Sequence, residues 1–225
     1  MVTLEAGRLE MVQEFFVNWY RQFGRSFPWR SHGTSPFVCL VTEMLLRQTR
    51  AAHVANIWDD FFRKYPSAKT LMDADPDELM RDVQVLGFGR QRSEALRTAS
   101  RWLCLHHGGE VPATESELIA IPHVGAYTAR AVLCFAYNQP VAIVDTNILR
   151  FFSRYHGIEL RRLDNRRAPR VWELATAALP QNKEHVREHN YGLLDFTAAV
   201  CKPRNPSCTQ CPLVSSCTWG KHMVD

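Results

Sequence analysis

The pattern of apolar and polar residues predicts helices throughout this chain of 225 residues and gives no convincing strand. Residues that can cap a first helical turn stand before three of the helices: Ser35, Asp75 and Thr114. The helix after Ser35 is expected to run to about Gln48, and residues 86–89 are expected to form a turn. The remaining expected helices cover residues 7–24, 51–65, 90–107, 126–137, 146–156, 168–179 and 184–200.

Length and composition are those of a globular protein. The chain is long enough for one large domain or two smaller lobes, and 46% of its residues are apolar. No apolar run approaches the roughly 20 residues of a membrane span, and residues 1–16 lack the apolar core of a signal peptide. We therefore expect a cytoplasmic protein, associated with the nucleoid if it binds DNA.

The charge balance permits binding to nucleic acid without requiring it. The net charge is +4, and arginine, whose forked guanidinium suits contacts to phosphate, far outnumbers lysine. Several arginines fall between Glu159 and Arg170, a segment expected to be a solvated connection. Three cysteines stand in apolar helical contexts and are expected to be small core residues: Cys39, Cys104 and Cys134.

The other four cysteines lie close together in the last part of the sequence: Cys201, Cys208, Cys211 and Cys217. Their spacing, C-x6-C-x2-C-x5-C, lets four thiolates converge on one soft metal centre. Zinc ribbons usually use two separated C-x2-C pairs, whereas here one such pair has a single thiol on each side. The spacing favours an iron–sulfur cluster, with a zinc site and a pair of disulfides as the alternatives.

Residues 114–137 read as a helix, a tight turn and a second helix. In the turn, Pro122 ends the first helix and His123 tolerates a positive φ better than most residues. Gly125 stands directly before the second helix, whose free N–H groups and dipole form an anion site suited to a DNA phosphate. A helical corner without a binding role has the same pattern, so that alternative stays open on these residues alone.

Two carboxylates stand at unusual positions. Asp145 follows the apolar run 141–144 at a helix start, where a helix cap is the simpler interpretation. Glu43 lies between Thr42 and Met44 in an otherwise apolar helix. Burying a carboxylate is costly without a compensating purpose, and a half-exposed helix residue is the alternative.

The cysteine spacing resembles that of the helix–hairpin–helix DNA glycosylases of the endonuclease III and MutY superfamily, and three other stretches strengthen the resemblance. Residues 121–125 resemble the L-P-G-V-G hairpin, with histidine in place of the first glycine. Residues 141–147 resemble the motif that carries the essential aspartate of the family. Residues 42–49 resemble S/T-E-I/M-L-L/M-x-Q/R-T. The resemblance covers nearly the whole chain, about residues 15–219.

The resemblance implies an all-α, two-lobed helix–hairpin–helix glycosylase fold. A six-helix barrel lobe would cover residues 28–139, and a discontinuous lobe of residues 1–27 plus 140–225 would carry Asp145 and the iron–sulfur cluster loop. The target base would flip into the cleft between the lobes. One 4Fe-4S cluster is the implied cofactor, with a structural role because breaking an N-glycosidic bond moves no electrons.

The resemblance implies three catalytic residues: Asp145, Tyr127 and Glu43. Asp145 would stabilise positive charge on the deoxyribose and orient or deprotonate the attacking water, and Glu43 would contact the flipped base. Bifunctional relatives carry a Schiff-base lysine where this chain has Tyr127, so the phenol implies base removal without strand cleavage. An aromatic residue on a helix face is the alternative for Tyr127.

The resemblance also implies contacts with DNA from three parts of the chain. Gln48 would fill the gap left by the flipped base. The full set of implied DNA-binding residues is Arg47, Gln48, Arg50, His123, Val124, Gly125, Tyr127, Lys202 and Arg204.

Within the superfamily the chain is most similar to Mig-type G:T mismatch thymine glycosylases, for instance over residues 89–92 and 192–196. The implied function is a monofunctional enzyme that removes thymine or uracil opposite guanine in double-stranded DNA, acting as a monomer and without a membrane. One alternative is an adenine glycosylase acting on A:G or A:8-oxoguanine. The other is a non-catalytic module that binds lesions, although a pure binder of a polyanion needs no acidic group facing it.

Overall fold

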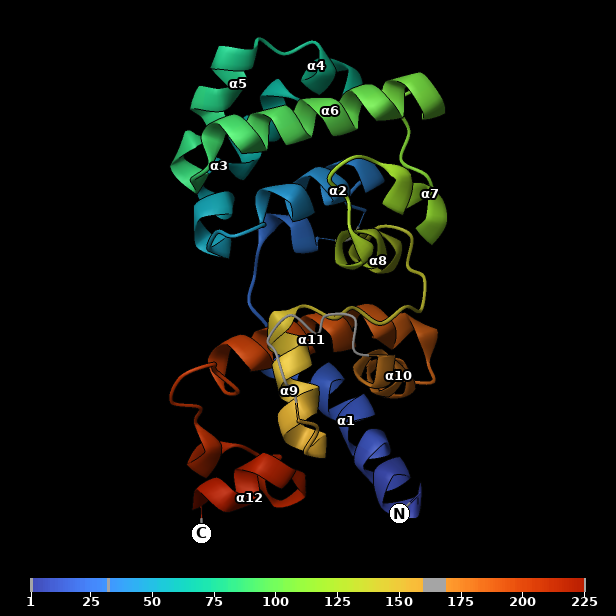
Figure 1. Cartoon of the computed structure of the whole chain (residues 1–225), viewed down its shortest axis with the longest axis vertical. Coiled ribbons are helices and arrows are strands. Elements are labelled where there is room, and N and C mark those ends of the chain that lie inside the picture. The colour runs from blue at the N-terminus through green and yellow to red at the C-terminus, as the bar shows by residue number, and fades with distance from the viewer. Residues whose placement is uncertain (1, 32, 160–168, 225) are drawn as a thin grey trace. The chain divides into compact units, whose positions relative to one another are not determined.

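The computed structural model describes residues 2–31, 33–159 and 169–224. Over these ranges the chain contains helices and loops but no strand, which confirms the all-α prediction (Figure 1). The α-helices are α1 (Val2–Phe23), α2 (Pro36–Leu45), α3 (Ala51–Lys64), α4 (Ala68–Met72), α5 (Pro76–Val83), α6 (Gly89–His107), α7 (Glu115–Ala120), α8 (Ala126–Phe135), α9 (Thr146–His156), α10 (Pro169–Ala177), α11 (Val186–Ala199) and α12 (Thr218–Val224). Short 3-10 helices accompany them: η1 (Pro28–Arg30), η2 (Gln84–Leu86), η3 (Lys183–His185), η4 (Cys208–Gln210) and η5 (Val214–Ser216).

The helices begin where the sequence offers a cap. The Ser35 hydroxyl accepts a hydrogen bond from the N–H of Val38 at 3.2 Å, directly before Pro36. The Asp75 carboxylate accepts one from the N–H of Glu78 at 2.8 Å. Thr114 caps α7 in the same way. Each cap satisfies an N–H group that has no partner within its helix, and all three predicted starts are confirmed.

Other boundaries differ from the sequence-based expectations. Helix α2 ends at Leu45 rather than near Gln48, and α8 ends at Phe135 rather than at residue 137. The five-residue helix α4 was not expected, because its capping box uses Ser67 and Thr70 instead of a glutamate. The expected solvated connection between Glu159 and Arg170 lies mostly outside the described residues.

The chain divides into two compact units, Ser26–Tyr137 and Met1–Arg25 with Asn138–Asp225. In the unit of residues 26–137, α2 is the central helix, and eight of its ten residues are buried. A helix that is apolar on all sides belongs in a core, and α2 contacts α3, α6 and α8. The long helix α6 packs against α4 and α5 (Figure 1).

The second unit is built on α1 and α11, which pack along each other. A Cβ atom at Gly192 would lie 2.0 Å from the carbonyl oxygen of Phe16, so only glycine allows this close approach. The rings of Phe16, Phe151 and Phe196 meet edge to face near this contact, with centroids 5.3 to 5.9 Å apart. This aromatic core fixes α9, the helix that follows Asp145.

The isolated cysteines agree with expectation at two of three positions. Cys39 and Cys134 are buried in the first unit. Cys104 is only half-buried on α6, so its assignment to the core was wrong. None of the described helices combines the length and the apolar character that crossing a bilayer requires.

Candidate functional site

The turn between α7 and α8 leaves a helix N-terminus open to ligands. His123 adopts φ +65°, so the left-handed turn forms without the glycine of the family motif. Gly125 is the N-cap of α8, and no side chain caps this end. Val124 is buried and anchors the turn, whereas His123 and Gly125 are exposed. The first N–H groups of α8 and the helix dipole together form an anion site.

The segment after α2 joins this turn in one surface. Arg47, Gln48 and Arg50 are exposed, and Gln48 adopts φ +54°. The Nη1 atom of Arg47 donates a hydrogen bond to the carbonyl oxygen of His123 at 3.0 Å. The structure therefore brings together the predicted DNA-binding residues of two segments that lie far apart in the sequence.

A cavity of about 360 Å³ opens beside these two segments. Arg47, Gln48 and His123 line it, together with Phe88 and Arg92, which sequence reasoning did not single out. Phe88 is 61% exposed and adopts φ +54°. Three non-glycine residues with positive φ thus line one cavity, and such strained residues cluster at functional sites. The sequence feature that could have pointed to Phe88 is its position as an aromatic residue between two glycines, Gly87 and Gly89.

Glu43 and Tyr127 occupy different environments in this same unit. Glu43 is 7% exposed within α2, so a half-exposed helix position is wrong and the carboxylate is buried. The neighbouring hydroxyl of Thr42 accepts a hydrogen bond from the indole N–H of Trp58 at 2.9 Å. Tyr127 is half-buried in the first turn of α8, two residues after Gly125. A carboxylate thus lies inside an apolar helix bundle, whereas Tyr127 belongs to the helical turn whose N–H groups form the anion site.

Asp145 caps α9 in the second unit. Its Oδ1 atom accepts hydrogen bonds from the N–H groups of Asn147 and Ile148 at 2.8 and 2.7 Å. Its Oδ2 atom accepts one from the Asn147 side chain at 2.8 Å. The carboxylate remains partly exposed. The cap interpretation is therefore confirmed, and it fixes the orientation of a carboxylate that still reaches solvent.

A chain of hydrogen bonds leads from Asp145 to the loop of the four cysteines. The Asn147 side chain links Asp145 to Arg150, whose Nη1 atom donates to Asn147 Oδ1 at 2.9 Å. Arg150 also donates to the carbonyl oxygen of Cys201 from Nε at 3.1 Å and from Nη2 at 2.8 Å, and to that of Thr197 at 3.2 Å. Burial lowers the pKa of the Arg150 guanidinium. Its electrostatic interaction with the Cys201 side chain raises the same pKa and offsets part of that decrease. Helix α9 is thereby fastened to the cysteine loop.

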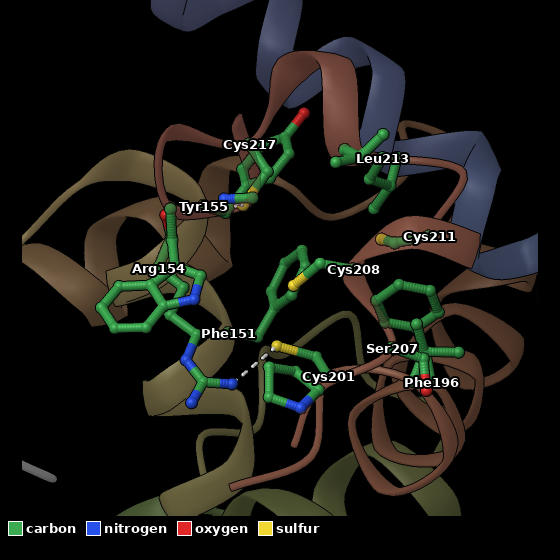
Figure 2. A pocket seen from close by; sticks show the side chains of 15 residues that line it. Phe151, Arg154, Tyr155, Phe196, Cys201, Ser207, Cys208, Cys211, Leu213 and Cys217 are labelled. Carbon is green, nitrogen blue, oxygen red and sulfur yellow. Dashed lines mark hydrogen bonds between the residues drawn. The ribbon is translucent and has the colours of Figure 1, made fainter. Parts of the chain in front are cut away.

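The four C-terminal cysteines line a single small cavity with mainly apolar walls (Figure 2). All of them are free thiols in this structure. Among the residues that the structure describes, no three His, Cys, Asp or Glu side chains are already gathered as a metal site.

The surroundings of the thiols fit a four-thiolate centre. Arg154 Nη1 donates to the sulfur of Cys201 at 3.6 Å (Figure 2), and the N–H of Gly220 donates to that of Cys217 at 3.2 Å. Burial and the neighbouring thiols raise the pKa of Cys211 to about 11, and burial also raises the pKa of Cys217. Four deprotonated thiols would repel one another here without a cation between them. The donor set and the apolar walls suit an iron–sulfur cluster.

The cysteine loop also carries the last two predicted DNA-binding residues. Arg204 is exposed, and Lys202 is half-buried. The carbonyl oxygens of Lys202 and Pro203 accept hydrogen bonds from Arg154 at 2.8 and 3.2 Å. The position of both side chains thus depends on how the loop is held against α9.

Comparison with known proteins agrees with these features. Residues 41–179 match the family described as HhH-GPD superfamily base excision DNA repair protein. A thymine/uracil-DNA glycosylase from Methanothermobacter thermautotrophicus is 39% identical, over 87% of this chain and 86% of that protein. An adenine DNA glycosylase from Mycobacterium tuberculosis is 38% identical, over 89% of this chain but 65% of that protein. The solved structure of a thermostable thymine-DNA glycosylase superposes with a TM-score of 0.87 and 34% identity, over 96% of this chain and 98% of that one.

Proposed function

Since the chain belongs to the HhH-GPD superfamily of base excision DNA repair proteins, we propose that it excises thymine or uracil mispaired with guanine. The observation that carries this proposal is the match to a thymine/uracil-DNA glycosylase over most of both chains, joined by a thymine-DNA glycosylase of the same fold. The reaction hydrolyses the N-glycosidic bond and leaves an abasic site in duplex DNA. The chain would act as a monomer.

Asp145 would supply the electrostatic part of catalysis. Cleavage of the N-glycosidic bond builds positive charge on the deoxyribose, and a nearby carboxylate stabilises that charge. Two backbone N–H groups and the Asn147 side chain hold the carboxylate in one orientation. A fixed carboxylate needs no reorganisation during the reaction and can also orient the attacking water.

Glu43 and Tyr127 would act on the extruded nucleotide. The buried carboxylate of Glu43 would form a hydrogen bond with the base, since bases taken out of the stack are read through their polar edges. Tyr127 has no amine with which to form an imine, and it would hold the nucleotide or the water instead. The enzyme is therefore proposed to be monofunctional, without strand cleavage.

The DNA would be held through its phosphates and opened by inserted side chains. The open N-terminus of α8 would bind a phosphate without reading sequence. Arg47, Arg50, Lys202 and Arg204 would add charge near the backbone. A mispaired base costs less to extrude than a paired one, which contributes to selectivity for mismatches. Gln48 would fill the gap in the stack, and the exposed ring of Phe88 adds a second candidate for insertion.

One 4Fe-4S cluster would be held by Cys201, Cys208, Cys211 and Cys217. It would supply a cross-link for the C-terminal loop rather than electrons for the hydrolysis. Loop residues Lys202 and Arg204 would then be held in place for contact with DNA.

The experiment is base release from labelled duplexes carrying G:T, G:U, A:G, A:8-oxoguanine or an oxidised pyrimidine, each treated with and without alkali. Release of thymine and uracil opposite guanine, with strand breaks only after alkali, is the expected result. Release confined to adenine would establish the second candidate, which the 38% identity to an adenine DNA glycosylase favours. Binding to a duplex without release of a base from any of them would instead favour a non-catalytic module that binds lesions.

A further inference from the structure

A single buried arginine, Arg92, organises the surface around the cavity described above. Arg92 lies in the first turn of α6 and is 7% exposed. Arg92 is one of the residues that line the same cavity as Gln48 and Phe88. Within the part of the chain that the structure describes, its hydrogen-bond partners are backbone carbonyl oxygens rather than carboxylates.

The hydrogen bonds of Arg92 go to two separate turns. Towards the end of α2, Nη1 donates to the carbonyl oxygens of Met44 and Leu45 at 3.0 and 2.9 Å, and Nη2 donates to that of Arg47 at 2.9 Å. Towards the turn before α6, Nη2 and Nε donate to the carbonyl oxygens of residues 86 and 87 at 3.4 and 3.3 Å. Arginine presents its N–H donors in a rigid fork, so one side chain can hold both turns at a fixed spacing.

Each turn presents one exposed side chain on a strained backbone. Gln48 directly follows the last of the three carbonyls at the end of α2 and adopts φ +54°. Phe88 directly follows Gly87, and these two residues adopt φ +54° and +81°. Left-handed conformations of residues other than glycine cost conformational energy and persist only where the surroundings hold them. Arg92 stabilises these conformations through its buried hydrogen bonds to the two turns. It lies at the C-terminal end of α2, where a cation also interacts favourably with the helix dipole.

We propose that Arg92 is a positioning residue for base extrusion, which holds the turns of Gln48 and Phe88 in the conformation that inserts both side chains into mismatched DNA. This inference rests on the proposed function and deepens it. Arg92 itself need not touch the DNA, because its donors face carbonyl oxygens. A residue that acts this way fixes the spacing of two inserted side chains that belong to different segments of the chain.

The test is a set of variants assayed for extrusion separately from bond cleavage. 2-Aminopurine placed beside a G:T mismatch reports unstacking, and the Asp145→Asn background keeps the base attached. Arg92→Met should reduce the extruded population roughly tenfold to hundredfold, as expected for the loss of hydrogen bonds from a charged donor. Arg101→Met removes an exposed arginine from the same helix and should change extrusion by less than about twofold.

A double-mutant cycle separates positioning from general stabilisation. In a background with Gln48→Ala and Phe88→Ala, Arg92→Met should cause no more than about a twofold further loss, because the side chains that it positions are gone. An equal loss of extrusion in both backgrounds, or no loss in the background that keeps Gln48 and Phe88, overturns the proposal.

Arg92→Lys keeps the charge but not the forked set of donors. Its extruded population should lie between that of Arg92→Met and that of the wild type. Extrusion by Arg92→Lys at the wild-type level would also overturn the proposal.

Amide hydrogen exchange of the holoprotein without DNA tests whether Arg92 stabilises the two turns. Arg92→Met should speed exchange in residues 46–50 and 86–90 and leave α8 unchanged. Unchanged exchange in both turns overturns the proposal. If the wild-type protein releases and extrudes no base while these turns still loosen in the variant, the proposed function has failed and Arg92 is a structural cap only.

Discussion

At the scale of single residues, Asp145 has two roles that one substitution can separate. An asparagine side chain at this position would still cap α9, because asparagine is as good an N-cap as aspartate, but it would carry no charge. Asp145→Asn should therefore slow base release about hundredfold or more, while the free energy of unfolding changes by less than about 1 kcal/mol. Single-turnover release and thermal unfolding measure the two effects. Release at the wild-type rate would remove Asp145 from the catalytic role.

Tyr127 decides between base removal alone and strand cleavage. Tyr127→Lys places an amine where the proposed nucleotide site has a phenol, and an amine attacking C1′ forms an imine that borohydride traps. We expect a trapped protein–DNA adduct and some strand scission without alkali. Tyr127→Phe serves as the control and should give neither. The absence of any adduct from the lysine variant would show that this side chain does not reach C1′.

His189 gives the second unit a dependence on pH. It is fully buried beside Phe16, and its Nδ1 atom lies 3.1 Å from the carbonyl oxygen of Gln13. Burial lowers its pKa from 6.5 to about 4. Because the unfolded chain binds the proton more tightly, the stability is complete above pH 6.5 and declines as the pH falls towards 4, by up to about 3 kcal/mol.

A variant at this position isolates the effect. His189→Asn keeps an N–H donor for Gln13 but does not titrate. Its free energy of unfolding should be lower overall, because the smaller side chain leaves a cavity, but it should change less than that of the wild type between about pH 7 and pH 5. Denaturant unfolding at several pH values measures the slope. Equal slopes for both proteins would assign the pH dependence to other groups.

At the scale of helices, hydrogen bonds between residues close in the sequence could be predicted, whereas those between distant residues could not. The caps at Ser35 and Thr114 act within three residues, so their helices could be predicted. Asp145 was also recognisable as a cap, and the resemblance to glycosylases supplied its expected role. By contrast, Arg92 and Arg150 donate to carbonyl oxygens more than forty residues away. Carbonyl groups are present at every residue, so no sequence pattern marks such partners, and both arginines were missed.

Helix α9 depends on one of these missed arginines. Arg150→Met removes the hydrogen bonds to Asn147 and to the carbonyl oxygens of Thr197 and Cys201. We expect a loss of about 2 to 3 kcal/mol in the free energy of unfolding, together with lower retention of iron during purification. Lys183→Met, which removes an exposed cation from the same unit, is the control and should change neither quantity. Wild-type stability and iron content in Arg150→Met would mean that the cysteine loop is held without this residue.

At the scale of the whole molecule, the C-terminal segment of residues 201–224 differs from the rest of the chain in what keeps it folded. The unit of residues 26–137 has an apolar core around α2. Residues 201–224 bury few side chains, Leu213 among them, and their contacts with α9 include hydrogen bonds from Arg154 and Tyr155. A segment with so small a core needs a cross-link to stay folded. We propose that the four cysteines provide it through their cluster.

Removing the cluster should therefore unfold one part of the protein selectively. After oxidative loss of iron in the presence of a chelator, amide exchange should accelerate in residues 201–224 and at the start of α9, and stay unchanged in α2 and α8. Base release should fall as well, because Arg150 links the carbonyl oxygen of Cys201 to Asn147 and hence to Asp145. Stoichiometric zinc without iron or sulfide in the purified protein would contradict the cluster. Unchanged exchange after iron loss would show instead that the loop folds through its own contacts, and Asp145 would then owe its position to the helix cap alone.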